Sequence, residues 1–316
     1  MIHRHDVNQT PDKSEDTVTV SDRGLAYGDG LFETIAFVNG ALNHWQLHWQ
    51  RLKSGADRLA INLPDEQYFL EQINTKNSLC NDLHPDRVIK IIVTRGQGGR
   101  GYLYPEPQKP TIIITVHTWP ERAVEDYHYG IRVTICQTCL ANQPALAGIK
   151  HLNRLEQVLG RNEFSASQYQ EGIMLACSDK PSAISSGTPL NMDSLMIEGT
   201  SSNLFFVING RLLTPKIDTC GVLGTIRQAV IVLAKQLGIE VEEDHYVLSE
   251  LGNASEVFFT NSLFGILPVA AITVSDDLQW RFGLQEGLQD DLQIRNISST
   301  LAITINKALN RPITLY

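Results

Sequence analysis

Leu146-Ala147-Gly148-Ile149-Lys150-His151-Leu152-Asn153-Arg154-Leu155-Glu156-Gln157 is the stretch of the chain that decides its fold. It places Lys150 at the end of a small apolar run, residues 145–149, and just ahead of an amphipathic helix. A lysine in water has a pKa of about 10.4 and is a poor nucleophile because it is protonated. Apolar surroundings disfavour the charged form, which lowers the pKa of the amine and frees it to condense with an aldehyde or ketone. The commoner alternative is a lysine that only marks the junction of a strand and a helix.

A lysine of this kind is what pyridoxal phosphate enzymes use, and their site also needs a cation for the phosphate group. Arg51 is the candidate, since an arginine can bind phosphate oxygens through two N–H groups at once. Apolar residues at helical spacing place it beside the buried stripe of a helix: Leu47, Leu52, Ala56 and Leu59. The alternative is an arginine that extends along this stripe to solvent.

Backbone N–H groups for the same phosphate have a candidate in Gly221-Val222-Leu223-Gly224-Thr225-Ile226-Arg227, where two glycines precede an apolar helix over 226–237. The N-terminus of a helix attracts anions, because its first N–H groups are unpaired and the helix dipole points the same way. Thr260-Asn261-Ser262, at the end of a predicted strand over 256–259, could add a contact. An ordinary loop and an ordinary strand end are the alternatives.

The pyridine nitrogen needs a carboxylate, and Glu198 in Ile197-Glu198-Gly199-Thr200-Ser201-Ser202-Asn203 is the candidate. A carboxylate there keeps the nitrogen protonated, so that the ring can withdraw electrons from a substrate carbon. The alternative is a polar turn before a strand over 203–208.

Taken in order, these segments resemble the fold-type IV pyridoxal phosphate enzymes, the family of branched-chain aminotransferases, D-amino acid aminotransferases and aminodeoxychorismate lyases. The resemblance covers almost the whole chain, through segments such as Ser21-Asp22-Arg23-Gly24, Gly28-Asp29-Gly30-Leu31-Phe32-Glu33-Thr34 and Leu263-Phe264-Gly265-Ile266-Leu267-Pro268-Val269. Two segments, 95–102 and 147–159, are most similar to those of the lyases.

The resemblance implies pyridoxal phosphate as the cofactor, Lys150 as its Schiff-base and catalytic residue, Arg51 on the phosphate and Glu198 opposite the pyridine nitrogen. It implies that four further residues complete the phosphate site: Thr225, Ile226, Asn261 and Ser262. It also implies a mixed α/β (α+β) fold of two domains and a homodimer. We expect a small N-terminal α/β domain over 1–120, a linker over 121–130, and a larger cofactor-binding domain over 131–316 with a mixed, barrel-like sheet.

The lyase resemblance implies conversion of 4-amino-4-deoxychorismate to 4-aminobenzoate and pyruvate, a step in folate biosynthesis. The alternative is transfer of an amino group by a D-amino acid or branched-chain aminotransferase, which begins with the same proton abstraction by Lys150. A binding module without catalysis is the third hypothesis. For the carboxylates of the substrate Arg100 is the first candidate, with Arg154 and Arg95 behind it.

Composition narrows the other possibilities. The 316 residues carry a net charge of −9, which argues against nucleic acid or an anionic membrane as a partner. No segment approaches a membrane span and none is typical of a secretion signal, so we expect a cytoplasmic protein. The histidines show no spacing typical of metal ligands, so we expect no bound metal. Its cysteines are odd in number and scattered, which favours reduced thiols over a zinc site or disulfides: Cys80, Cys136, Cys139, Cys177 and Cys220.

Local patterns predict the main elements. Strands are expected at 31–38, 87–94, 111–116, 131–136, 172–177, 203–208, 241–246 and 256–259, and helices at 45–61, 66–76, from 153, from 225 and at 292–310. Residues 1–14 are expected to be poorly ordered, and 178–194 to form a long exposed loop. Gly96-x-Gly98-x-x-Gly101 has the spacing of a dinucleotide fingerprint, but three prolines follow it, so the required helix cannot form.

Overall fold

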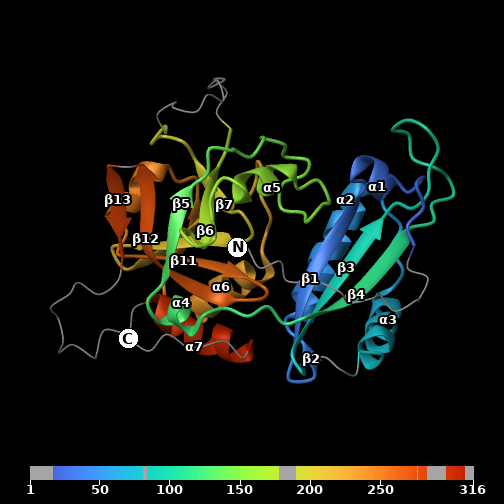
Figure 1. Ribbon diagram of the computed structural model, residues 1–316, viewed down its shortest axis with the longest axis horizontal. Helices are drawn as coiled ribbons and strands as arrows, with labels where there is room; N and C mark the ends of the chain where they lie inside the picture. The colour runs from blue at the N-terminus through green and yellow to red at the C-terminus, as the bar shows by residue number, and fades with distance from the viewer. Residues whose placement is uncertain (1–16, 81–83, 178–189, 276, 283–296, 310–316) are drawn as a thin grey trace, which may run out of the picture.

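The computed structural model describes residues 17–80, 84–177, 190–275, 277–282 and 297–309. The predictions for residues 1–14, for most of the 178–194 loop and for the start of the 292–310 helix lie outside these ranges. Two β-sheets lie side by side, each with its own helices (Figure 1).

The smaller sheet is antiparallel, with the order β2-β1-β3-β4. Its strands are β1 (Gly30–Val38), β2 (Ala41–Leu42), β3 (Arg87–Thr94) and β4 (Thr111–Thr118), and its helices are α1 (Arg23–Tyr27), α2 (Trp45–Leu59) and α3 (Glu66–Ser78). Asn39 and Gly40 form the turn that joins β1 to β2, and both are at positive φ as such a hairpin requires.

The two faces of β1 pack against different cores, because successive side chains of a strand point to opposite sides of the sheet. Leu31 and Ile35 pack with α2 and α3 in the core of the smaller lobe. Ala36 and Val38 belong instead to a core cluster of the larger lobe. β1 therefore contributes to both lobes, and its second face looks toward the larger sheet.

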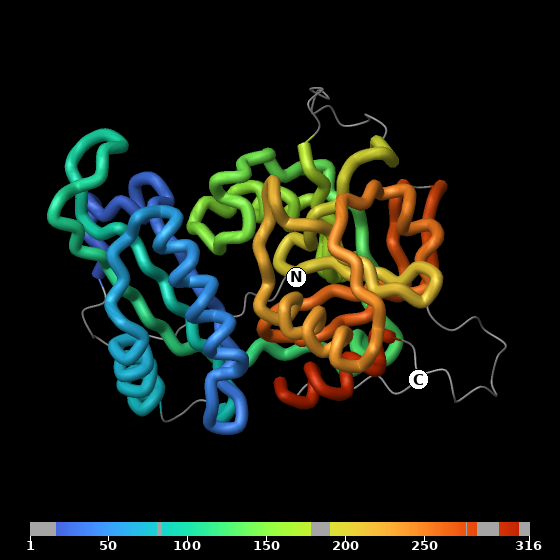
Figure 2. The backbone as a smooth tube through the Cα atoms, turned by 180° about the vertical axis from the view of Figure 1, so that it is seen from behind, coloured from blue at the N-terminus to red at the C-terminus, as the bar shows by residue number. Residues whose placement is uncertain are grey.

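The larger sheet has the order β10-β9-β8-β11-β12-β5-β6-β7, with β13 beside β12. Its strands are β5 (Ile131–Ile135), β6 (Glu171–Leu175), β7 (Met196–Gly199), β8 (Asn203–Ile208), β9 (Arg211–Pro215), β10 (Val241–Asp244), β11 (Glu256–Asn261), β12 (Gly265–Ser275) and β13 (Leu278–Arg281). Strands β7 and β8 are far apart in this order, yet only residues 200–202 separate them in sequence. The sheet therefore has to curl, which gives the predicted barrel-like core (Figure 2).

Helices pack against both faces of this curled sheet: α4 (Val124–His128), α5 (Leu155–Arg161), α6 (Thr225–Gln236), the 3-10 helix η1 (Leu248–Asn253) and α7 (Ile297–Ala308). α6 and α7 pack on one face through residues such as Ile226, Val230 and Leu301. α4 lies within the segment predicted to be a linker, and its Tyr127 is fully buried in the core of the larger lobe. Part of that segment is therefore integral to the larger lobe.

Some strands escaped the sequence prediction, notably β7, β9, β12 and β13. β12 contains Pro268, a residue that argues against a central strand because it lacks an N–H. Pro268 nevertheless pairs with Phe258 of β11, and the register with β5 shifts at the next residues, between Val269 and Ala271. This irregularity accommodates the proline.

The prediction that all cysteines are reduced thiols is wrong for two of them. Cys139 and Cys177 form a disulfide, with their Cα atoms 5.0 Å apart. They are 38 residues apart in sequence, and they meet because the segment at Leu140 runs beside the end of β6 and forms a bridge with Ala176. The Cys-x-x-Cys spacing is incidental, since Cys136 is buried and unpaired.

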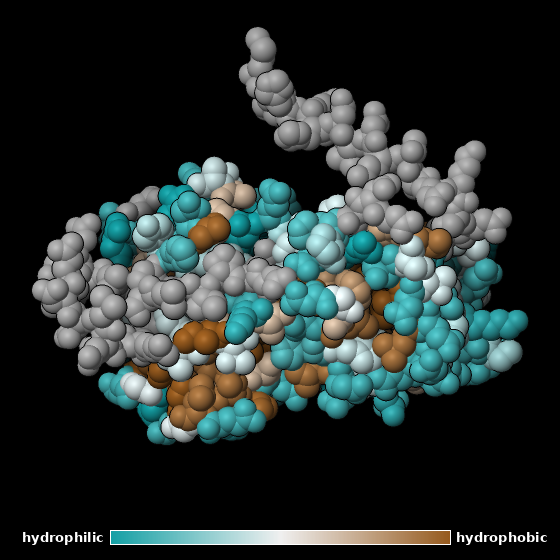
Figure 3. All heavy atoms as spheres, turned by 90° about the horizontal axis from the view of Figure 1, so that it is seen from below, coloured by the Kyte–Doolittle hydropathy of each residue, from teal (hydrophilic) through white to brown (hydrophobic). Residues whose placement is uncertain are grey.

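One face of the molecule shows how polar and apolar residues are distributed on its surface. Seen from below, it is largely hydrophilic, with hydrophobic patches over both halves of the molecule (Figure 3). Within the described ranges, no helix combines the length and the apolar character needed to cross a bilayer.

Candidate active site

A cavity of about 320 Å³ lies where the two lobes meet. Phe32, Thr34 and Arg51 line it from the smaller lobe. The larger lobe contributes Lys150, Arg154, Gln157, residues 198–203, Val222, Gly224, Thr225 and residues 260–263. The structure thus gathers around one cavity six of the seven predicted site residues: Lys150, Arg51, Glu198, Thr225, Asn261 and Ser262.

Lys150 lies on a segment that is bonded to both lobes. The Phe32 N–H of β1 donates to the Lys150 carbonyl over 2.9 Å, and the Leu152 N–H donates to the Gly30 carbonyl over 3.0 Å. On the other side, the Gly148 N–H donates to the Gly221 carbonyl over 2.9 Å. The backbone on each side of Lys150 is therefore fixed, and its Nζ lies 4.3 Å from the centre of the Phe32 ring.

The surroundings of Lys150 lower the pKa of its amine to about 7. Burial is the main cause, because it disfavours the charged form, and the positive charges of Arg51 and Arg154 act in the same direction. The carboxylates of Glu33 and Glu198 oppose the shift. At neutral pH a large fraction of the amine is therefore unprotonated and nucleophilic, as the sequence predicted.

Arg51 is held by Glu33, a residue that the sequence analysis did not single out. Its Nε donates to Glu33 Oε1 over 2.8 Å and its Nη2 to Oε2 over 2.5 Å, while Nη1 donates to the Leu223 carbonyl over 2.9 Å. Glu33 also contacts His48 Nδ1 at 2.6 Å. Glu33 is buried, but Arg51 and His48 hold the pKa of its carboxyl at about 2. This ion pair fixes the guanidinium at the edge of the cavity.

The N-terminus of α6 faces the same end of the cavity. The N-cap, Gly224, has no side chain to cap the helix, and the first backbone bond of the helix is from the Gln228 N–H to the Gly224 carbonyl. The N–H groups of residues 225–227 precede that bond and lack partners within the helix. The Ile226 side chain is buried in the core beneath α6, so the role predicted for this residue would rest on its backbone N–H.

Asn261 and Ser262 line the cavity, but their side chains already have partners. Asn261 Oδ1 accepts from the N–H groups of Leu263 and Phe264, both over 2.9 Å, which fixes the turn after β11. Ser262 Oγ donates to the Thr34 carbonyl over 2.7 Å and so ties this turn to β1. Both residues therefore shape the site as well as line it.

Glu198 lies at the end of β7 and is 4% exposed. Its Oε2 accepts from the Val222 N–H over 2.8 Å, and Gln157 Nε2 lies 3.5 Å from Oε1. Burial raises the pKa of its carboxyl, although Arg154 and the Val222 N–H oppose this. This carboxyl therefore binds a proton more readily than a carboxyl in water, and it lies where a basic nitrogen could share that proton.

Glu171 organises the turn that follows Glu198. Its carboxylate accepts hydrogen bonds from the Thr200 N–H, from the Thr200 and Ser201 hydroxyls, and from Ser202 Oγ over 2.7 Å. This role could not be expected from local patterns, because Glu171 lies 27 positions before Glu198, at the start of another strand.

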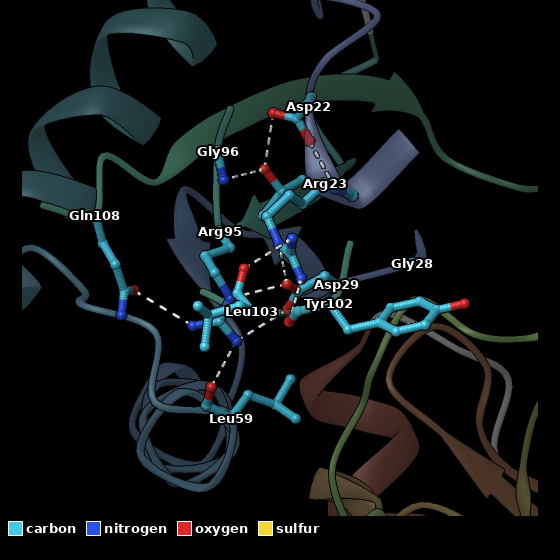
Figure 4. A network of polar contacts seen from close by, with 12 residues as sticks. Asp22, Arg23, Gly28, Asp29, Leu59, Arg95, Gly96, Tyr102, Leu103 and Gln108 are labelled. Atoms are coloured by element: carbon cyan, nitrogen blue, oxygen red, sulfur yellow. Dashed lines mark hydrogen bonds and ion pairs between the residues drawn. The ribbon is translucent and has the colours of Figure 1, made fainter. Parts of the chain in front are cut away.

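The three arginines proposed for substrate carboxylates have different environments. Arg95 is 1% exposed and donates to both carboxylate oxygens of Asp29 and to the Leu59 carbonyl (Figure 4). It also donates to the Ala60 carbonyl. It is a structural residue, so its assignment to the substrate is wrong. Arg100 does not line the cavity of this chain, and Arg23 holds the carbonyls of the neighbouring residues 101–103.

Arg154 is the arginine of the three that lines the cavity. Its Nε donates to the His151 carbonyl over 2.9 Å and its Nη2 to the Ile149 carbonyl over 3.0 Å. No hydrogen bond within the described ranges involves its Nη1. This N–H group is therefore available to a bound carboxylate.

A family model described as amino-transferase class IV matches residues 30–272. The chain belongs to the class IV aminotransferase family. An aminodeoxychorismate lyase of Vibrio harveyi is 32% identical over 261 residues, which cover 82% of this chain and 89% of the relative. A D-alanine aminotransferase of Bacillus licheniformis is 27% identical over 262 residues, covering 83% and 85% of the two chains.

Solved structures give the same family relationship. The 4-amino-4-deoxychorismate lyase from Pseudomonas aeruginosa is 39% identical with a TM-score of 0.72, and the match covers 85% of this chain and 91% of that one. The branched-chain amino acid aminotransferase of Escherichia coli is 26% identical with a TM-score of 0.69, covering 85% and 86%. The predicted fold-type IV architecture is confirmed.

Members of the class IV aminotransferase family, including its lyases, use pyridoxal phosphate. The residues of this member fit that cofactor. Lys150 offers an amine with a lowered pKa, Glu198 offers a buried carboxyl, and Arg51 lies beside the uncapped N-terminus of α6. These groups complement an aldehyde, a pyridine nitrogen and a phosphate.

Proposed function

We propose that this class IV family member is a pyridoxal phosphate-dependent lyase that converts 4-amino-4-deoxychorismate to 4-aminobenzoate and pyruvate. The observation that carries the proposal is the presence of Lys150, Glu198 and an available Arg154 Nη1 on one cavity. The similarity to aminodeoxychorismate lyases, in the two segments noted above and among both relatives and solved structures, supports it.

Lys150 would hold the cofactor through its amine and would also serve as the general base. When bound, pyridoxal phosphate supplies a sink for the electrons left on the substrate carbon after proton loss. With the cofactor bound, the Lys150 amine would act as the general base that takes the proton from the amine-bearing ring carbon. The electrons of that C–H bond would complete the aromatic ring as the bond from the ring to the enolpyruvyl oxygen breaks, and the departing enolpyruvate would take up the proton at its methylene carbon to become pyruvate.

The remaining cofactor groups have fixed roles in this proposal. Glu198 keeps a proton at the pyridine nitrogen. Arg51, the N–H groups of Thr225 and Ile226, and the turn of Asn261 and Ser262 hold the phosphate. The ion pair between Arg51 and Glu33 presents the guanidinium in one orientation, so that little conformational entropy is lost on binding.

Arg154 is our candidate for a substrate carboxylate. Aminodeoxychorismate carries two carboxylates, and the chain is acidic overall, so a local cation has to attract them. Arg154 lines the same cavity as Glu198 and Gln157, and its positive charge acts on the Glu198 carboxyl. This proximity to Glu198 supports Arg154 as the residue that binds a substrate carboxylate.

The decisive experiment supplies purified protein and pyridoxal phosphate with aminodeoxychorismate, and follows 4-aminobenzoate and pyruvate together. We expect the two products in equal amounts. Faster formation of glutamate from 2-oxoglutarate and an amino acid donor would overturn the proposal in favour of the aminotransferase. The similarity to the Escherichia coli branched-chain aminotransferase is what makes that second function worth testing.

We further propose that the protein is a cytoplasmic homodimer that serves folate synthesis. Helix α5 supports the dimer, because three of its seven residues are large, apolar and exposed: Leu155, Val158 and Leu159. An exposed apolar face of this kind is typical of a subunit interface. The helix directly follows Lys150 and Arg154, so a partner subunit on it would lie near the cavity.

A further inference from the structure

Thr260 carries a buried hydroxyl that has no hydrogen-bond partner among the described residues. Two residues that line the cavity each have a buried polar atom without a hydrogen bond in the described part of the chain: Gln157 Oε1 and Thr260 Oγ1. Gln157 is only half-buried, and its amide group lies beside Glu198. Thr260 is 1% exposed. An unpaired hydroxyl this deeply buried costs free energy, which a bound ligand could recover.

The register of the larger sheet shows which way Thr260 points. On β11, Phe258 faces the core beneath α6 and stacks on its partner Phe205 of β8, with ring centres 5.1 Å apart. Side chains two positions apart on a strand share a face, so Thr260 points to the same side as Phe258. Its partner on β8 is Asn203.

Asn203 links this position to the N-terminus of α6. Its Nδ2 donates to the Val222 carbonyl over 2.8 Å, and its Oδ1 lies so close to Gly224 that a Cβ there would be 1.9 Å away. Directly paired side chains of antiparallel strands have Cβ atoms about 5 Å apart. The Thr260 hydroxyl therefore lies beneath the first turn of α6, at the end of the cavity that Arg51 also lines.

We propose that Thr260 is a further ligand-binding residue, whose hydroxyl donates a hydrogen bond to the phosphate group of the bound cofactor. The proposal rests on the proposed function insofar as the ligand is pyridoxal phosphate. Thr260 lines the same cavity as Arg51 and the start of α6, whose first N–H groups have no partner within the helix, and an anion is most stable there. The segment Thr260-Asn261-Ser262 was expected to contact the phosphate through Asn261 and Ser262, whose side chains are bonded to the backbone instead.

Thr260→Val is the informative variant, because valine keeps the branched shape and removes the hydroxyl. In cofactor-free protein the hydroxyl has no partner to lose, so we expect the Tm to stay the same or rise. The affinity for pyridoxal phosphate should fall by roughly 10- to 100-fold, since a hydrogen bond to a charged group is lost. Thr260→Ser should retain most of the affinity.

Thr214→Val is the matched control. Thr214 is also fully buried in the larger sheet, but its hydroxyl donates to the Leu204 carbonyl over 2.8 Å. It does not line the cavity. This variant should therefore show the opposite pattern, with a lower Tm and unchanged affinity for the cofactor.

Pyridoxal, which lacks the phosphate, tests the assignment of the ligand group. Thr260→Val should weaken pyridoxal phosphate binding much more than pyridoxal binding. Equal weakening of both, unchanged affinity for pyridoxal phosphate, or a Tm that falls as far as in Thr214→Val overturns the inference. If the wild-type protein does not bind pyridoxal phosphate at all, the proposed function is wrong. If the wild type binds it and Thr260→Val binds it equally well, only the role of Thr260 is wrong.

Discussion

The pKa of Lys150 makes cofactor capture depend on pH near neutrality. Its folded value of about 7 lies below the ordinary value of 10.5, chiefly because of burial. The amine is thus protonated and unreactive below pH 7, and free above it. We expect the rate of pyridoxal phosphate binding to rise roughly tenfold from pH 6 to pH 8. Stopped-flow absorbance would measure it, and a rate that still rises steeply above pH 9 would contradict the lowered pKa.

The same burial predicts that Lys150→Met stabilises the cofactor-free protein. The unfolded chain binds a proton at this lysine up to about pH 10.5 and the folded chain only to about pH 7. The lysine therefore lowers the free energy of unfolding most at and below pH 7, and this cost disappears as the pH rises toward 10.5. We expect a Tm a few degrees higher for Lys150→Met at pH 7, measured by calorimetry.

Lys90 is the control for the chemistry of Lys150. Its Nζ also lies near the Phe32 ring, at 5.9 Å, but Lys90 does not line the cavity. Borohydride reduction of the holoenzyme followed by peptide mapping should place the cofactor on Lys150. An adduct on Lys90 would disprove the assignment.

Glu198→Gln should keep the cofactor and lose most of the activity. An amide can accept the Val222 N–H as the carboxylate does, so the local fold should persist. The neutral glutamine amide cannot hold a proton at the pyridine nitrogen. A preorganised electrostatic contribution of this kind lowers the activation free energy by roughly 3 kcal/mol, so we expect kcat to fall about 100-fold. Steady-state kinetics with a spectrum of the bound cofactor would separate the two effects. Turnover near that of the wild type would reduce Glu198 to a turn residue.

At the scale of the element, Glu171 decides the shape of the turn between β7 and β8. Glu171→Gln replaces one acceptor oxygen with a donor that faces hydroxyl donors. We expect a loss of about 2 kcal/mol in the free energy of unfolding and weaker cofactor binding. Glu163→Gln is the control, because the Glu163 carboxylate also accepts several hydrogen bonds, from Gln137 and Thr138, on an exposed turn away from the cavity. Equal effects of the two variants on cofactor affinity would argue against this role.

Strands that are marked by a run of β-branched and apolar residues could be predicted from the sequence. Strands that are recognised only by their pairing with segments distant in sequence could not. The ranges predicted for β3 and β8 agree with the structure to the residue, because runs of β-branched and apolar residues are a local property. β12 was missed because Pro268 argues against a strand, and only its place between β11 and β5 reveals one.

The same division applies to the site. Lys150, Arg51 and Glu198 could be proposed because each lies in a distinctive local segment, and all three line one cavity. Glu33 and Glu171 were not singled out, because their importance comes from what lies beside them after folding. Arg95 was misread for the same reason, since nothing in the sequence indicates that Asp29 and two carbonyls surround it.

At the scale of the whole molecule, the apolar face of α5 predicts the assembly. Leu155→Asp places a charge on a residue that is 76% exposed in the single chain, so it should not disturb folding. We expect the dimer to dissociate to monomers, as measured by sedimentation velocity. Leu79→Asp is the control, because Leu79 is similarly exposed, at 68%, at the end of α3. A wild-type protein that is monomeric at micromolar concentration would remove the dimer from the proposal.

The bonding of the Lys150 segment to both lobes has a dynamic consequence. The lobes cannot hinge apart without breaking the bonds that Phe32 and Leu152 make across the boundary. Amide hydrogen exchange at these two residues therefore measures the undocking of the lobes, which requires less free energy than unfolding either of them. A ligand that contacts both lobes should slow exchange at both amides by the same factor. Separation of the lobes at the Lys150 segment should then limit the rate at which the cofactor dissociates.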